Sequence, residues 1–219
     1  MYRVDDLAVL RDIKEGRIRI GLGEYAVVKS NIMDYLETIN RKAQIIGPKD
    51  ASYIIFHCGI RAGSTVVEGG VGSGALTMAL LYFTYPGGHV FTYEKRKDFA
   101  EFARRNVQRG EYSHWTLKIG DVTRDVSERD VDAYILDIPE PWLGVDMAIK
   151  ALRSGGCFAA YVPTYNQLER TYKDLKKSGF IELKAVEIIM RGIHVGPLGT
   201  RPENIEVAHT GFIVFGRKV

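Results

Sequence analysis

Residues 64 to 77, STVVEGGVGSGALT, decide the fold of this chain. Val66 and Val67 are β-branched and predict a buried strand that ends at Glu68. Three glycines follow at every second position: Gly70, Gly72 and Gly74. Ala75 then begins an apolar pattern of helical period, and the first turn of a helix has free amides. Because glycine has no Cβ to hold a ligand away, the stretch predicts a strand, a turn that approaches a ligand closely, and a helix.

The rest of the chain alternates between apolar, β-rich runs and segments of helical period. We predict parallel strands at residues 64–69, 89–93, 115–119, 131–138 and 156–162, and helices at residues 75–84, 97–109, 141–153 and 165–178. The runs at 181–191 and 208–216 have no helical pattern between them and predict an antiparallel pair at the sheet edge. The fold class is therefore α/β, a doubly wound seven-stranded sheet whose antiparallel end is typical of methyltransferases rather than dehydrogenases.

Composition sets the broad class. The chain has 219 residues and a formal charge of +3, which permits a polyanionic partner without requiring one. No apolar run approaches the ~20 residues that span a bilayer, so we expect no membrane association and a cytoplasmic protein. The two cysteines, Cys58 and Cys157, lie far apart in the sequence and outside any CxxC pair, so we expect two buried core thiols, with neither a zinc site nor a disulfide framework.

The first 40 residues differ from the rest. Short apolar runs between glycines predict two or three short strands, which we interpret as a small β-rich appendage at 1–40 before a domain at 41–219. A polar linker leads to Asp50, which we predict to cap the helix that carries Ile54 and Cys58.

The glycine spacing excludes two common ligands. A dinucleotide fingerprint needs its third glycine three residues after the second, and a phosphate loop needs a lysine after the last glycine; neither is present. A ligand without phosphates, such as S-adenosyl-L-methionine, is favoured. Glu94 and Asp121 end the next two strands, where they can bind ribose hydroxyls and an adenine amino group, and Asp137 ends the fourth. All three carboxylates are predicted at the edge where open α/β sheets bind ligands.

Several motifs together resemble the tRNA (adenine-N1)-methyltransferase family that modifies the T-loop adenine, over about four fifths of the chain. They are EGGVGSGALT, YEKRKDF, the Gly120–Asp121 pair, LDIPEPW, YVPTYNQ and HTGFIVF. The resemblance implies methyl transfer from S-adenosyl-L-methionine to N1 of a tRNA adenine. The residues that it implies for cofactor contact are Ile46, Ser73, Gly74, Ala75, Glu94, Asp121, Val122 and Asp137. Asp137 would also meet the target base, and Tyr161 would line the adenine pocket.

The resemblance also implies a homotetramer, whose four chains would sum to a charge of about +12 and attract tRNA. The chain departs from the family in its shortened N-terminal region and in Gly47, which replaces an aromatic residue near the target base. These departures keep two alternatives open. One is a methyltransferase of the corrinoid-pathway type that acts on a small molecule, and the other is a non-catalytic subunit of a tRNA methyltransferase complex.

Overall fold

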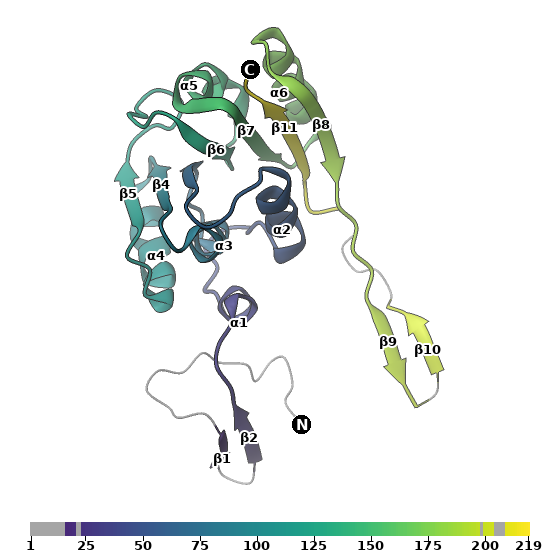
Figure 1. Cartoon of the computed structure of the whole chain (residues 1–219). Coiled ribbons are helices and arrows are strands. Elements are labelled where there is room, and N and C mark those ends of the chain that lie inside the picture. Colours follow the sequence, from purple (N-terminus) through teal and green to yellow (C-terminus); the bar gives the residue numbers. More distant parts are fainter. Residues whose placement is uncertain (1–15, 21–22, 198, 204–208) are drawn as a thin grey trace.

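A seven-stranded sheet forms the centre of the molecule (Figure 1). The computed structural model describes residues 16–20, 23–197, 199–203 and 209–219. The strands of the sheet are β3 (Thr65–Gly69), β4 (His89–Glu94), β5 (Trp115–Ile119), β6 (Val131–Leu136), β7 (Leu152–Val162), β8 (Ile181–Glu187) and β11 (Phe212–Arg217). Their order is β5-β4-β3-β6-β7-β11-β8, with β3 to β7 parallel and β11 antiparallel to both its neighbours. The predicted doubly wound sheet with an antiparallel last strand is confirmed.

Helices cover both faces of the sheet. One face carries α2 (Pro48–His57), α3 (Ala75–Thr84) and α4 (Lys97–Val107), and the other carries α5 (Val145–Ala151) and α6 (Tyr165–Lys177). Each face has its own apolar cluster, with Ile54 and Leu80 in the first and Tyr134, Phe158 and Leu175 in the second. Both faces are buried, which explains why the central strands read as nearly continuous apolar runs.

The N-terminal part contains a hairpin and a helix. β1 (Gly16–Ile20) pairs with β2 (Gly23–Val27), which confirms short strands there, although residues 1–15 lie outside the described part. The sequence did not predict α1 (Ile32–Glu37). Its signal is a capping box, because the Asn31 side chain accepts from the Met33 and Asp34 amides while Asp34 accepts from the Asn31 amide.

Two predicted helix boundaries were wrong. The helix α2 begins at Pro48 with Gly47 as its N-cap, so Asp50 lies inside the first turn and is not the cap. The predicted helix at 141–153 is a 3₁₀ turn, η3 (Pro141–Gly144), followed by the seven residues of α5, and β7 already begins at Leu152. The pairing of Leu152 with Val131 extends the strand toward the N-terminus.

The C-terminal segment was also predicted incompletely. β8 ends at Glu187, and a separate hairpin of β9 (Ile193–Gly196) and β10 (Gly199–Pro202) projects away from the sheet (Figure 1). β11 begins at Phe212 rather than at 208, which lies outside the described residues. Nearly all described side chains of this hairpin are exposed. Its strands therefore lack the alternation of buried and exposed positions by which a strand is recognised in a sequence.

Within the described part of the chain, none of the helices combines the length and the apolar character needed to cross a bilayer.

Candidate active site

A cavity of about 370 Å³ opens at the carboxyl edge of the parallel strands. Its wall is formed where β3, β4 and β6 end and by the loop after β5, and its volume lies in the range of small-molecule sites. Five of the predicted site residues line it: Gly70, Glu94, Asp121, Val122 and Asp137. The parallel sheet therefore brings together residues from four separate strand ends, as the sequence predicted.

The glycine turn after β3 has the backbone that only glycine adopts easily. Gly70, Gly72 and Gly74 have φ angles of 85°, 51° and 88°. Gly74 is the N-cap of α3, and its amide donates to the Val71 carbonyl at 2.8 Å. A Cβ added at Gly72 would meet no protein atom within 4 Å, so this position faces open space. The turn leaves room for a ligand at Gly72.

The Glu94 carboxylate is fixed at the end of β4 by backbone amides. Its Oε1 accepts from the Arg96 amide at 3.0 Å, and its Oε2 accepts from the Val71 amide at 3.3 Å. The Arg96 guanidinium also donates to Oε1 at 3.5 Å, so Oε2 is the oxygen that keeps a lone pair for a ligand hydroxyl. Glu94 is thus oriented toward the cavity before any ligand binds.

Neighbouring residues of the chain already bind both carboxylate oxygens of Asp121. Its Oδ1 accepts from the Thr123 amide and hydroxyl at 2.9 and 2.7 Å, and its Oδ2 pairs with Lys95 at 2.9 Å and Arg124 at 3.1 Å. Burial by itself would raise the pKa of Asp121. The hydrogen bonds from Lys95 and Thr123 and the positive charge of Lys95 have the larger effect, and they lower this pKa to about 2. The side chain is an anion that holds the β5 loop against the cavity.

Two acids near the cavity bind protons more strongly than usual. Burial raises the pKa of Asp137 to about 7, and the negative charge of Glu94 adds to the rise. Burial also raises the pKa of Glu68 to about 7, although Thr77 and Thr92 each donate to its Oε2 at 2.7 Å. The other Glu68 oxygen is buried without a partner among the described residues. The site therefore holds acids that exchange protons near neutral pH.

The remaining predicted cofactor contacts lie behind the cavity wall. Ser73 is buried, and its hydroxyl accepts from the Lys42 and Ala43 amides at 3.0 and 3.4 Å, which ties the linker to the glycine turn. Ala75 begins α3 and is buried, and Ile46 packs in the core beside α2 and α3. The structure thus brings these residues near the turn but not into the lining of the cavity.

Tyr161 is held by a buried polar network at the end of β7. Its hydroxyl donates to Asp50 Oδ2 over a long 3.5 Å, and Thr210 donates to the same oxygen at 3.0 Å. The Lys49 ammonium donates to Asp50 Oδ1 at 2.8 Å, to the Ile188 carbonyl at 2.6 Å and to Thr210 at 2.7 Å. Burial raises the pKa of Tyr161 to about 12, so its hydroxyl stays neutral, and the side chain is buried and outside the cavity lining.

Sequence reasoning missed several residues of the site. Lys49 and Thr210 carried no recognisable signal, because their contacts join α2 to the segment before β11. The cavity lining also includes Lys95, Arg96, Thr123, Ile138, Pro139, Glu140 and Leu143. Trp142 lies under the Arg170 guanidinium of α6, 4.2 Å from the ring centre, so it packs at the foot of the 3₁₀ turn and not in the lining.

Comparison with known proteins places the chain among RNA-modifying methyltransferases. A family model described as "tRNA methyltransferase complex GCD14 subunit" matches residues 34–199. The tRNA (adenine(57)-N(1)/adenine(58)-N(1))-methyltransferase of Methanocaldococcus jannaschii is 35% identical over 237 residues, which cover 95% of this chain and 84% of the relative.

Two solved structures share the fold. The tRNA (m1A58) methyltransferase of Aquifex aeolicus superposes with a TM-score of 0.82 at 26% identity, over 94% of this chain and 90% of that one. A protein of Thermotoga maritima described as a SAM-dependent O-methyltransferase superposes with a TM-score of 0.87 at 35% identity, over 94% of this chain and 78% of that one. The sheet and its helices are therefore those of class I methyltransferases that use S-adenosyl-L-methionine.

Proposed function

The chain belongs to the family of the tRNA methyltransferase complex GCD14 subunit, and on that premise we propose that it transfers a methyl group from S-adenosyl-L-methionine to N1 of an adenine in the tRNA T-loop. The observation that carries the proposal is the carboxyl group of Asp137 in the wall of the cavity, one strand away from the glycine turn and within the electrostatic reach of Glu94. A family match alone would leave the acceptor open, and Asp137 is the group that suits an adenine.

The residues of the cavity fit the proposed cofactor. When bound, S-adenosyl-L-methionine supplies an electrophilic methyl group on a sulfonium. Glu94 keeps an acceptor position on Oε2 for a ribose hydroxyl, and Val122 offers an apolar surface to the adenine. The space at Gly72 lets the backbone approach the methionine end, beside Gly70 and the turn formed by Ser73, Gly74 and Ala75. Asp121 fixes the loop around the adenine, and Ile46 supports the turn from the core.

Asp137 suits the chemistry of an adenine acceptor. N1 of adenine is already a nucleophile, so the enzyme must align it with the methyl group more than deprotonate it. The Asp137 carboxylate accepts a hydrogen bond from the exocyclic amino group and stabilises the positive charge that grows on the base. Its raised pKa means that the carboxylate form becomes dominant only above about pH 7.

The base must leave its stack before it can react. N1 is engaged in folded RNA, so the adenine has to be extruded into a pocket where an aromatic face replaces the lost stacking. Tyr161 is the candidate, because Asp50 holds its hydroxyl and thereby orients its ring. Gly47 is the N-cap of α2, and a Cβ added there would meet no protein atom within 4 Å, so in this proposal Gly47 leaves space beside the target base.

We propose a homotetramer as the working form. The hairpin of β9 and β10 extends away from the sheet, and its apolar side chains are exposed, with Val195 76% and Ile193 56% accessible. An isolated two-stranded hairpin is marginally stable in water, so a second copy of the chain is the natural cover for it. The same hairpin carries Arg201 opposite His194, and the Arg201 guanidinium adds positive charge that suits RNA. In this proposal residues 1–40 form an appendage, residues 41–219 form the methyltransferase domain, and the tRNA substrate implies a cytoplasmic location.

The test uses unmodified tRNA transcript and isotopically labelled S-adenosyl-L-methionine, followed by mass analysis of the nucleosides. The proposal expects labelled 1-methyladenosine that maps to the T-loop. The Thermotoga relative's description as an O-methyltransferase favours a second candidate, a small-molecule acceptor. That candidate predicts no label in tRNA and turnover of a small acceptor that competing RNA does not slow. If calorimetry detects no binding of S-adenosyl-L-methionine, the chain is instead a non-catalytic subunit.

A further inference from the structure

The two cysteines of the chain lie side by side at the edge of the sheet opposite the candidate active site. Cys58 is the C-cap of α2, one helical turn after the buried Ile54. Cys157 belongs to β7, where it pairs with Ala133 in β6 and with Arg217 in β11. Both thiols pack against the apolar cluster that α2 shares with the sheet, so the fold joins positions that are about 100 residues apart in the sequence.

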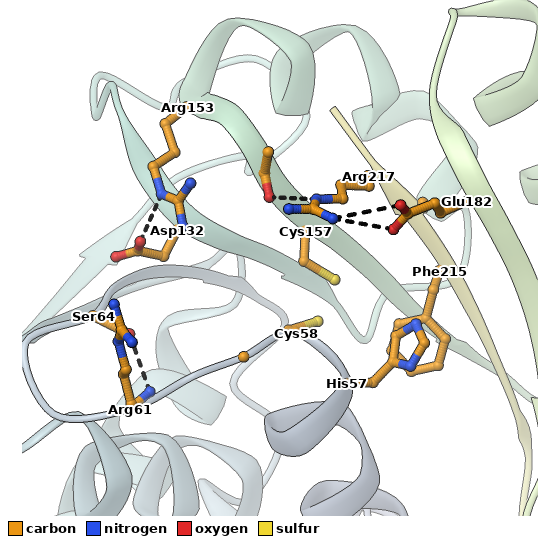
Figure 2. Close-up of a pocket in the computed structure, with 13 residues that line it drawn as sticks. His57, Cys58, Arg61, Ser64, Asp132, Arg153, Cys157, Glu182, Phe215 and Arg217 are labelled. Atoms are coloured by element: carbon orange, nitrogen blue, oxygen red, sulfur yellow. Dashed lines mark hydrogen bonds and ion pairs between the residues drawn. The ribbon is translucent and has the colours of Figure 1, made fainter. Parts of the chain in front are cut away.

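The thiols border a second cavity of about 360 Å³ (Figure 2). Figure 2 shows the sulfur atoms of Cys58 and Cys157 pointing into the space between α2 and β7. Charged side chains form the rim of the cavity, where Arg153 pairs with Asp132 at 2.8 Å and Arg217 pairs with Glu182 at 3.3 Å. A polar rim of this kind admits water and small water-soluble oxidants to the two sulfur atoms.

Neither thiol has a role in the chemistry of the candidate active site, which lies at the other end of the strands. Burial raises the pKa of the Cys58 thiol well above its usual value, and the neighbouring Cys157 raises it further. Cys58 is therefore a protonated thiol at neutral pH, which makes its oxidation slow but does not prevent it. The sequence expectation of two inert core thiols leaves their contact with each other unexplained.

We propose that Cys58 and Cys157 are a redox pair that closes to an intramolecular disulfide when the folded protein meets hydrogen peroxide. One thiol reduces the peroxide and becomes a sulfenic acid, with release of one water molecule. The second thiol then attacks that sulfur and forms the S–S bond, with release of a second water molecule. The bond ties the end of α2 to β7 and closes a loop of about 100 residues, which stabilises the fold by restricting the unfolded chain.

The experiment treats the purified full-length chain with hydrogen peroxide under native conditions and measures the intact mass without reductant. The proposal expects a loss of about 2 Da, and peptide mapping should recover a peptide linked through Cys58 and Cys157. Oxidation should raise the melting temperature by about 5 to 15 °C, and added reductant should reverse the rise. The share of oxidised chains that end as the Cys58–Cys157 disulfide should also be higher in the folded protein than in urea, because folding holds the second thiol beside the sulfenic acid.

Matched variants separate the pair from nonspecific oxidation. Cys58→Ala and Cys157→Ala should each gain about 16 or 32 Da instead of losing 2 Da, and peroxide should not raise their melting temperatures. Three results would each overturn the proposal: a wild-type chain that only gains oxygen or forms covalent dimers, a disulfide yield that is higher in urea than in the folded protein, or a disulfide that lowers the melting temperature. Because the wild-type measurements need no variant, misfolding of either alanine variant would not weaken the test.

Discussion

The backbone of Gly70 lies directly against the carbonyl oxygen of Asp137, so closely that a Cβ added at Gly70 would overlap that oxygen. The Gly70 amide also donates to the Tyr93 carbonyl at 2.9 Å, and the Asp137 amide donates to the Gly69 carbonyl at 2.8 Å. The ends of β3, β4 and β6 are therefore locked to one another through main-chain contacts. The position of the Asp137 carboxyl group depends on these main-chain contacts.

Gly70→Ala should destabilise the fold by about 3 kcal/mol, because the new methyl group adds a clash to a φ angle of 85°. The measurement is equilibrium unfolding in urea. Gly59→Ala is the matched control, since Gly59 has a φ angle of 64° but no atom within 4 Å of an added Cβ, and it should cost about 1 kcal/mol. Equal losses of unfolding free energy in Gly70→Ala and Gly59→Ala would show that the contact of Gly70 with Asp137 does not contribute to stability.

Gly72→Ala should separate ligand binding from folding. Its Cβ meets no protein atom within 4 Å, so its stability should match that of Gly59→Ala. The methyl group would nevertheless enter the space assigned to the methionine end of S-adenosyl-L-methionine. The Kd for this cofactor should therefore rise at least tenfold, which corresponds to a loss of about 1.4 kcal/mol in binding free energy. Isothermal titration calorimetry measures this Kd for the wild-type chain and for Gly72→Ala. An unchanged Kd would mean that the cofactor does not approach Gly72.

The pH dependence of kcat/KM should report Asp137. Its pKa is about 7, so the carboxylate that accepts from the adenine is lost as pH falls, and kcat/KM should decline below pH 7. The contribution of Asp137 to folding stability changes with pH in the opposite direction. The folded chain keeps a proton on Asp137 that the unfolded chain releases near pH 4, so this group contributes less stability as pH rises from 4 to 7.

Two variants identify the group that titrates. Glu94→Gln removes the charge that helps raise the Asp137 pKa, so the decline should move to lower pH. Glu68→Gln preserves the shape of the other acid whose pKa is near 7 and should leave the decline in place. If the decline vanished in Glu68→Gln and stayed fixed in Glu94→Gln, the assignment to Asp137 would be wrong.

Lys49→Met should destabilise the chain by about 3 kcal/mol, because it leaves the Asp50 carboxylate, which is 1% exposed, without its cation. Asp50, which accepts from the Tyr161 hydroxyl, would lose the cation that holds it in place, so methylation should fall along with stability. The control is Lys95→Met, which removes an ion pair to Asp121 from a lysine whose side chain is 62% exposed and should cost under about 1 kcal/mol. Urea titrations that gave similar losses for both lysines would contradict the importance of the buried network.

The architecture was predictable because the central strands are buried on both faces and separated by clear helical periods. The common edge of four site residues was predictable for the same reason, since parallel strands must bring the ends that carry Gly70, Glu94, Asp121 and Asp137 together. The roles of these residues stay predictions. The β9–β10 hairpin has only four residues in each strand, and all but one of them are exposed among the described residues, so no longer pattern of burial marks it in the sequence.

Contacts between distant segments could not be read from the sequence. Lys49 and Thr210 are separated by most of the chain, and their hydrogen bond depends on how α2 docks against the segment before β11. Asp50 has the residue type of a helix cap, but Pro48 sets the start of α2 and places the carboxylate inside the fold. Cys58 and Cys157 were likewise predicted to be buried separately, and only the packing of α2 on the sheet shows that they are neighbours.

The most direct test measures 1-methyladenosine formation on unmodified tRNA by the wild-type chain, by Asp137→Ala and by Asp146→Ala. Asp146 is an exposed acid in the first turn of α5, so its loss controls for the change in charge. The account predicts labelled 1-methyladenosine in the T-loop for the wild type and Asp146→Ala, and a fall in kcat of at least about 100-fold for Asp137→Ala with calorimetry still detecting the cofactor. Undiminished methylation by Asp137→Ala, or no tRNA methylation by a wild-type chain that binds the cofactor, would contradict it.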